Sequence, residues 1–156
     1  MSDSPKSYFA LLGEMRKDAH AASALKSLDV IDTKAGGLAG LIGGFAAAST
    51  IVLQSLWAKA DFPVATIIVG GSLGLFAFAG LMCATCLTII SHFDKKLFEG
   101  SEALEDQERI DAAASKALII YNGRVFRYRL AVFALLGGIA ILVLGVIVAG
   151  GIALLP

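Results

Sequence analysis

Charge is missing from three long stretches of this 156-residue chain, at residues 35–58, 62–93 and 130–156. Each stretch is longer than the roughly 20 residues that a helix needs to cross about 30 Å of hydrocarbon. One charge at the centre of a bilayer costs about 2.5–3.5 kcal/mol, so such windows are typical of membrane spans. The alternative is a soluble bundle, but so short a chain that is 57% hydrophobic has too little core to bury this apolar surface. The sequence therefore predicts an all-α membrane protein with three transmembrane helices.

Residue types that carry catalytic or metal chemistry are also scarce. His20 and His92 are the two histidines; they are far apart in sequence, and neither belongs to a metal-type cluster, so a structural or interfacial role is expected for each. Cys83 and Cys86 have the CxxC spacing of redox sites, but inside an apolar helix they are interpreted as small buried thiols. No ionisable residue falls in the middle of a span, which argues against a pump or coupled transporter. Without a catalytic triad, carboxylate pair or phosphate loop, we expect no enzyme, no metal and no resident cofactor.

The positive charges are distributed unevenly, although 13 basic and 13 acidic residues give a net charge of zero that favours no nucleic-acid partner. Five basic residues precede the first stretch and seven lie between the second and third. Only Lys59 lies between the first and second, and none follows Arg129. Because Lys and Arg accumulate in cytoplasmic loops, we predict a cytoplasmic N-terminus and an external C-terminus.

The expected order follows from these boundaries. It is a cytoplasmic amphipathic helix over 1–34, a first span over 35–58, a short outer loop over 59–63, a second span over 64–90, a cytoplasmic helical segment over 91–129 and a third span over 130–155, all in one domain. The apolar face of the first helix could lie on the membrane or pack within the protein; its acidic residues favour internal packing.

The second cytoplasmic segment is predicted to form a stalk. Gly100 interrupts the helical pattern, and Ser101 can cap a new helix. Acidic residues are concentrated in the first turns of that helix, where the helix dipole favours them. We expect one helix from Ser101 into the third span, with a cytoplasmic part of roughly 40 Å. The second span is expected to extend through His92 towards Phe98.

Glycines recur at four-residue spacing in the first two spans. The row is Gly36, Gly40 and Gly44, with a second pair at Gly70 and Gly74. This spacing places the missing side chains on one helix face, where another helix can approach closely. We expect close helix contacts there, within one chain or between chains.

Two charged clusters flank the predicted membrane boundary, at residues 29–34 and 122–129. Ordinary anchoring explains Lys34 and Arg129, but not aspartates beside anionic head groups. Asp32 and Lys34 could instead pair with Arg124 or Arg127. Arginine and asparagine at this level could also hold an anionic ligand. All three interpretations stay open on the residues alone.

The sequence Asp32-Thr33-Lys34-Ala35 opens a glycine-rich first span, and Leu118-Ile119-Ile120-Tyr121-Asn122 leads through three arginines into the last one. This layout resembles the transmembrane effectors of the Pycsar antiphage system over roughly residues 8–150. The resemblance implies a multi-pass protein of the bacterial inner membrane, with a periplasmic C-terminus. It also implies a response to cyclic CMP or cyclic UMP made by a partner cyclase, followed by membrane impairment and arrest of the infected cell.

Carried over by position, the resemblance points to Asp32, Lys34, Asn122 and Arg124 as nucleotide-binding residues, and Arg127 joins them through its charge. No separate cyclic-nucleotide domain is present, so such a site would be built from the stalk of a homo-oligomer. Two other classes of function stay open: a constitutive, holin-like pore without a ligand, and a scaffold subunit of a larger membrane complex. A cyclase gene beside this one would favour the effector.

The uneven distribution of basic residues generates a topology prediction. A reporter that is active only in the cytoplasm should be silent when fused after Pro156, because no basic residue follows Arg129 to hold that end inside. The same reporter fused before residue 8 is the matched control and should be active. Strong activity from the Pro156 fusion would contradict the three-span order.

Overall fold

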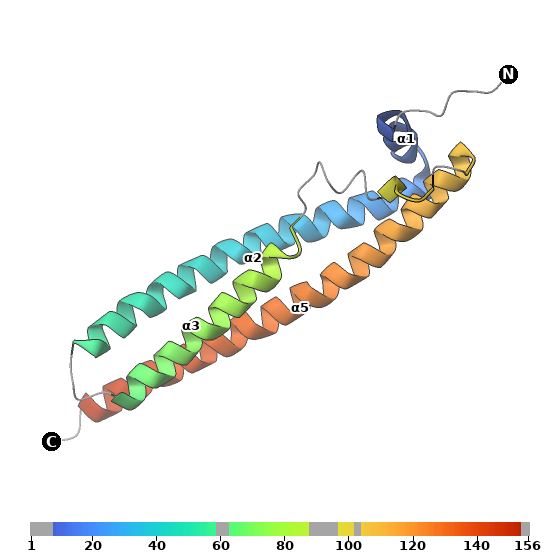
Figure 1. The fold of residues 1–156 in the computed structure, drawn as a ribbon. Helices are drawn as coiled ribbons and strands as arrows, with labels where there is room; N and C mark the ends of the chain where they lie inside the picture. The colour runs from blue at the N-terminus through green and yellow to red at the C-terminus, as the bar shows by residue number, and fades with distance from the viewer. Residues whose placement is uncertain (1–7, 59–62, 88–96, 102–103, 154–156) are drawn as a thin grey trace. The chain divides into compact units, whose positions relative to one another are not determined.

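The computed structural model describes residues 8–58, 63–87, 97–101 and 104–153. Within them the chain is helical and contains no strand. The helices are α1 (Tyr8–Met15), α2 (Ala19–Trp57), α3 (Pro63–Ala84) and α5 (Asp106–Ala153) (Figure 1). The short outer loop expected over 59–63 lies almost wholly outside the described residues.

Three of these helices, α2, α3 and α5, are long and apolar enough to cross a membrane. The prediction of an all-α membrane protein with three spanning helices is therefore confirmed. With 39 residues, α2 is about 58 Å long, and α5 with 48 residues is about 72 Å long, at 1.5 Å per residue. Both lengths exceed the roughly 30 Å of hydrocarbon, so each helix has a part that lies outside it.

The chain divides into two compact units. The stalk unit lies within Met1–Lys34 and Leu87–Phe126, and the membrane unit within Ala35–Cys86 and Arg127–Pro156. These divisions fall close to the limits of the charge-free stretches. Both α2 and α5 contribute residues to each unit.

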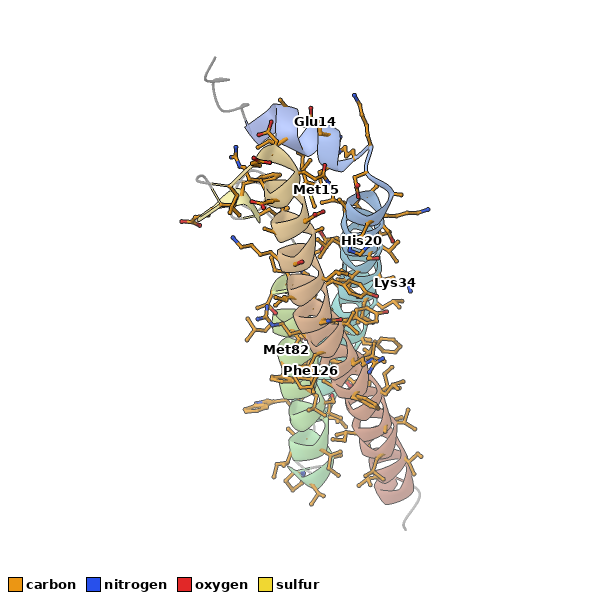
Figure 2. The ribbon with its side chains drawn as sticks, turned by 90° about the vertical axis from the view of Figure 1, so that its right-hand side faces the viewer. Glu14, Met15, His20, Lys34, Met82 and Phe126 are labelled. Atoms are coloured by element: carbon orange, nitrogen blue, oxygen red, sulfur yellow. The ribbon has the colours of Figure 1, made fainter. Side chains whose placement is uncertain are left out.

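The N-terminal segment forms two helices instead of the single helix expected over 1–34. Asp18 causes the break, because its Oδ1 accepts hydrogen bonds of 2.9 Å from the backbone amides of His20 and Ala21 and so caps α2. Leu11 and Met15 of α1 are fully buried in the stalk core with alanines of α2 and α5. Internal packing of this segment is thus confirmed. The labelled side chains in Figure 2 show Glu14 and Met15 on α1 and His20 on α2.

Two further helix ends differ from the predictions. The α5 helix begins at Asp106, not at Ser101, whose buried hydroxyl donates a hydrogen bond of 2.7 Å to the Phe98 carbonyl. Gly100 just before it has a positive φ of 79°, which glycine adopts without strain. The α3 helix ends at Ala84, earlier than the 64–90 span, and a turn closed by Cys86 N and Cys83 O at 2.9 Å follows. The expected extension through His92 lies outside the described residues.

The membrane unit packs around Phe76 of α3. Its ring is 1% exposed and stacks on Phe45 of α2 at 6.0 Å between centroids. On the α5 side, Gly138 faces the same ring so closely that an added Cβ would lie 2.5 Å from it. A Cβ added at Gly145 would likewise lie 2.7 Å from the Val69 side chain. Close helix packing in this unit therefore depends on glycines of α5.

The glycines expected to form the contacts lie elsewhere. A Cβ added at any of Gly36, Gly40, Gly44, Gly70 or Gly74 would meet nothing within 4 Å. Within the chain, these positions therefore form no close helix contact. Spacing on one helix shows where side chains are small, whereas the approach of a neighbour is decided by the opposite helix. Contact between chains at these glycines stays a prediction.

This difference predicts opposite outcomes for two matched substitutions. Gly138→Ala should lower the stability of the membrane unit by about 1–3 kcal/mol, because the methyl group overpacks the buried Phe76 ring. Gly40→Ala should leave it unchanged or slightly raised, since open space surrounds that position within the chain. Thermal unfolding of the detergent-solubilised protein measures both. Equal effects would contradict the α3–α5 contact.

Candidate functional site

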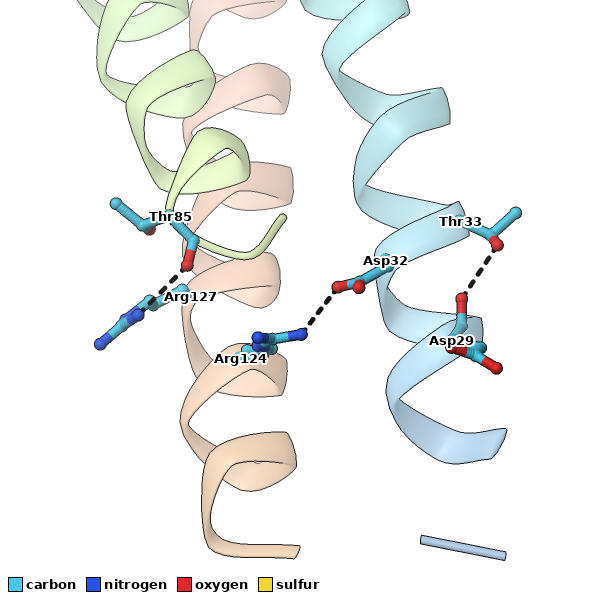
Figure 3. A network of polar contacts seen from close by, with 6 residues as sticks. All are labelled: Asp29, Asp32, Thr33, Thr85, Arg124 and Arg127. Carbon is cyan, nitrogen blue, oxygen red and sulfur yellow. Dashed lines mark hydrogen bonds and ion pairs between the residues drawn. The ribbon is translucent and has the colours of Figure 1, made fainter. Parts of the chain in front are cut away.

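An ion pair between α2 and α5 is the central polar contact of the stalk unit. Nη1 of Arg124 donates a hydrogen bond of 2.9 Å to Oδ1 of Asp32 (Figure 3). The arginine side chain is 9% exposed and the aspartate side chain 27%. Hydrogen bonds between two charged groups are among the strongest in proteins, and this one is partly shielded from water.

Helical periodicity brings these two side chains together. On α2, Leu28, Ile31 and Ala35 form the buried stripe, and Asp32 follows Ile31 at the stripe's edge. On α5, Arg124 comes seven residues after the fully buried Ala117, so it lies on the same inward face. Alanines on that face leave room for a long side chain.

Arg127, by contrast, belongs to the membrane unit and contacts α3. Its Nη1 donates to the backbone carbonyl oxygen of Thr85 at 3.3 Å, just after α3 ends (Figure 3). The last carbonyls of a helix have no partner within it, and a basic side chain is one of the groups that satisfy them. The sequence predicted Arg127 either for an anion site or for an ion pair with Asp32 or Lys34, and it does not indicate this capping role.

The remaining predicted site residues point to solvent. Lys34 and Asn122 are both exposed, as is Asp29, whose backbone carbonyl accepts the Thr33 hydroxyl at 2.9 Å. Of the five residues predicted to bind a nucleotide, the structure joins Asp32 with Arg124. An expected pairing between the two charged clusters is therefore present, through one aspartate and one arginine.

Sequence reasoning missed two buried polar features. Arg109 is buried in the stalk unit with its Nη1 3.9 Å from Oδ1 of Asp106, and its Nε has no hydrogen-bond partner among the described residues. In the membrane unit, the fully buried Ser49 and Ser72 connect α2 and α3, with their hydroxyl oxygens 3.5 Å apart. Serines in an apolar span carry no sequence signal that distinguishes an interhelical contact from a bond to their own helix.

Neither a metal cluster nor a relative defines the chemistry further. Within the described part of the chain, no group of three or more His, Cys, Asp or Glu residues is close enough to hold a metal ion, and Cys83 and Cys86 are buried free thiols. Comparison with known proteins gives no match to a protein-family model, a curated protein or a solved structure.

The ion pair generates a prediction about stability. Asp32→Ala should destabilise the stalk unit by roughly 2–4 kcal/mol, because it leaves the more deeply buried Arg124 without its charged partner. Arg124→Ala should cost less, since the more exposed aspartate can be hydrated. Adding Arg124→Ala to Asp32→Ala should then cause little further loss.

Chemical unfolding of the four proteins in detergent measures this double-mutant cycle. Arg16→Ala, at an exposed arginine before α2, is the matched control for loss of one positive charge. Additive losses in the cycle would show that the two side chains do not interact.

Proposed function

We propose that the chain is a membrane effector of antiphage defence. It responds to cyclic CMP or cyclic UMP from a partner cyclase by impairing the bacterial inner membrane, which arrests or kills the infected cell. It acts as a homo-oligomer in contact with membrane lipid, with its N-terminus in the cytoplasm and its C-terminus in the periplasm. The resemblance of residues 32–35 and 118–129 to such effectors supports this function.

The observation that carries the proposal is the Asp32–Arg124 ion pair. Its two residues lie on α2 and α5, and each of these helices also supplies a candidate membrane span. A ligand that competes for Arg124 therefore acts directly on helices that continue into the bilayer. A ligand can shift a conformation only through different contacts in the two states, and an arginine that exchanges one anion for another provides such a difference.

The chemistry of the ligand matches that of the residues. A cyclic nucleotide carries one phosphodiester anion, which a guanidinium binds through two parallel hydrogen bonds. When the phosphate replaces Asp32, the aspartate loses its partner and the α2–α5 contact weakens. Lys34 and Asn122 are exposed and lie two residues from Asp32 and Arg124, which places them on other helix faces, so the phosphate contact rests on Arg124.

The proposal predicts how single charges control the response. In cells that co-express a cyclic CMP or cyclic UMP synthase, Arg124→Ala should abolish membrane depolarisation, because the anion loses its binding group. Asp32→Asn should depolarise at lower synthase levels, since Arg124 is then released more easily. A potential-sensitive dye measures the response, and membrane insertion is confirmed in parallel for each variant.

Two controls make the test decisive. Arg16→Ala removes an exposed arginine outside the site and should respond like the unsubstituted protein. Binding of labelled cyclic CMP or cyclic UMP to the purified protein should disappear in Arg124→Ala and persist in Arg16→Ala. Full depolarisation by Arg124→Ala would remove this residue from the mechanism. Depolarisation without any synthase, at matched expression, would instead favour a constitutive pore.

A further inference from the structure

Large apolar side chains are exposed on the part of α5 that belongs to the stalk unit. Ile119 is 72% exposed and Phe126 is 64% exposed. Contact with lipid hydrocarbon does not explain the exposure of Ile119, because Arg124, Arg127 and Arg129 separate this residue in sequence from the charge-free stretch. Large apolar groups gathered on one exposed face commonly mark an interaction surface.

These side chains follow a seven-residue repeat. Ile119, Phe126 and Phe133 are seven residues apart, and Phe133 is 71% exposed. Asn122 lies three residues after Ile119, as Leu136 does after Phe133, and both are exposed. Positions with this 3–4 spacing form the contact line of a coiled coil, in which they are called a and d.

We propose that this seam face of α5, formed by Ile119, Asn122, Phe126, Phe133 and Leu136, pairs with the same face of a second copy of the chain. Two copies inserted alike in one bilayer have α5 helices that run parallel. A two-fold axis along the membrane normal then places each seam residue opposite its equivalent. Asn122 meets Asn122 of the other copy, and because each amide both donates and accepts, the two side chains can hydrogen-bond across the axis.

Charges beside the seam fit this parallel arrangement. In a parallel pair, a g residue lies near the e residue five positions later on the partner helix. With Ile119 at a, Asp111 is at g and Lys116 at e, so the two copies form complementary ion pairs. The Lys116 ammonium also donates to the Glu99 carbonyl of its own chain, and it has further donors for Asp111. The next flanking positions, Leu118 and Gly123, carry no charge to repel a partner.

One seam position opposes association. Arg129 occupies the d position after Phe126, and two equivalent arginines repel each other across the axis. Long arginine side chains can turn towards the head groups, which weakens this repulsion without removing it. The seam is therefore less stable at this level than at Ile119, and removal of the charge should strengthen it.

Disulfide crosslinking in membranes tests the seam. Ser115→Cys places a thiol at the exposed d position before Ile119, and mild oxidation should give several-fold more covalent dimer than Ser23→Cys on the exposed face of α2. The unsubstituted protein measures background from the buried Cys83 and Cys86. Gly40→Cys tests the glycine row. Dimer that forms through Gly40→Cys or Ser23→Cys but not through Ser115→Cys would overturn the proposal.

Second substitutions in the Ser115→Cys protein identify the residues responsible. Ile119→Asp should reduce crosslinking several-fold, whereas Arg129→Leu should increase it. Val30→Asp is the matched control, because Val30 is an exposed apolar residue of α2 in the same unit. Since all these residues are exposed, folding of the single chain should persist. Crosslinking that Ile119→Asp leaves unchanged would assign this face to lipid or another protein. These measurements need no cyclase, so they stand apart from the nucleotide response.

Discussion

A backbone inside hydrocarbon has no water to bond with, so its amides and carbonyls must pair within their own helix. This constraint determines the continuous hydrogen bonding of α2, α3 and α5 across the apolar stretches. Once a helix has formed, each further residue adds a bond at little cost, and α2 and α5 therefore extend beyond those stretches. The parts of α2 and α5 beyond the apolar stretches include Leu28 and Ala117, which are buried in the stalk core. The helices that the membrane requires thus also form the framework of the stalk unit.

The spanning helices were predictable because the penalty for charge in lipid acts on every residue of a long stretch. The helix ends were not, because each is decided by one local bond. Asp18 accepts hydrogen bonds from the amides of His20 and Ala21 and starts α2 there, whereas α5 begins at Asp106 and not at Ser101, whose hydroxyl donates to the Phe98 carbonyl. Equally plausible capping residues occur elsewhere in the sequence, so only packing selects among them.

The candidate site shows the same limit. Opposite charges at one level made a pairing between residues 29–34 and 122–129 one of three open interpretations, and Asp32 with Arg124 forms such a pair. The choice of partners depends on helix phase: Asp32 borders the buried Ile31, whereas Lys34 points to solvent. The glycine row failed as an in-chain contact for a related reason. Phe76 approaches Gly138, and the sequence of α2 contains no information about that approach.

Under the two proposals, Arg124 and the seam lie on opposite sides of the same helix. Arg124 is buried against α2, while Ile119 and Phe126 are exposed. A rotation of α5 that releases Arg124 from Asp32 would also turn the seam residues relative to the second copy. Binding of an anion and self-association would then be linked, and linkage is reciprocal. A ligand that changes the association constant by some factor must have its own affinity changed by the same factor when the chains pair. Such reciprocity distinguishes one helix with two states, shared by both sites, from two independent sites. If the sites were independent, ligand binding would not change the association constant of the chains, and association would not change the ligand affinity.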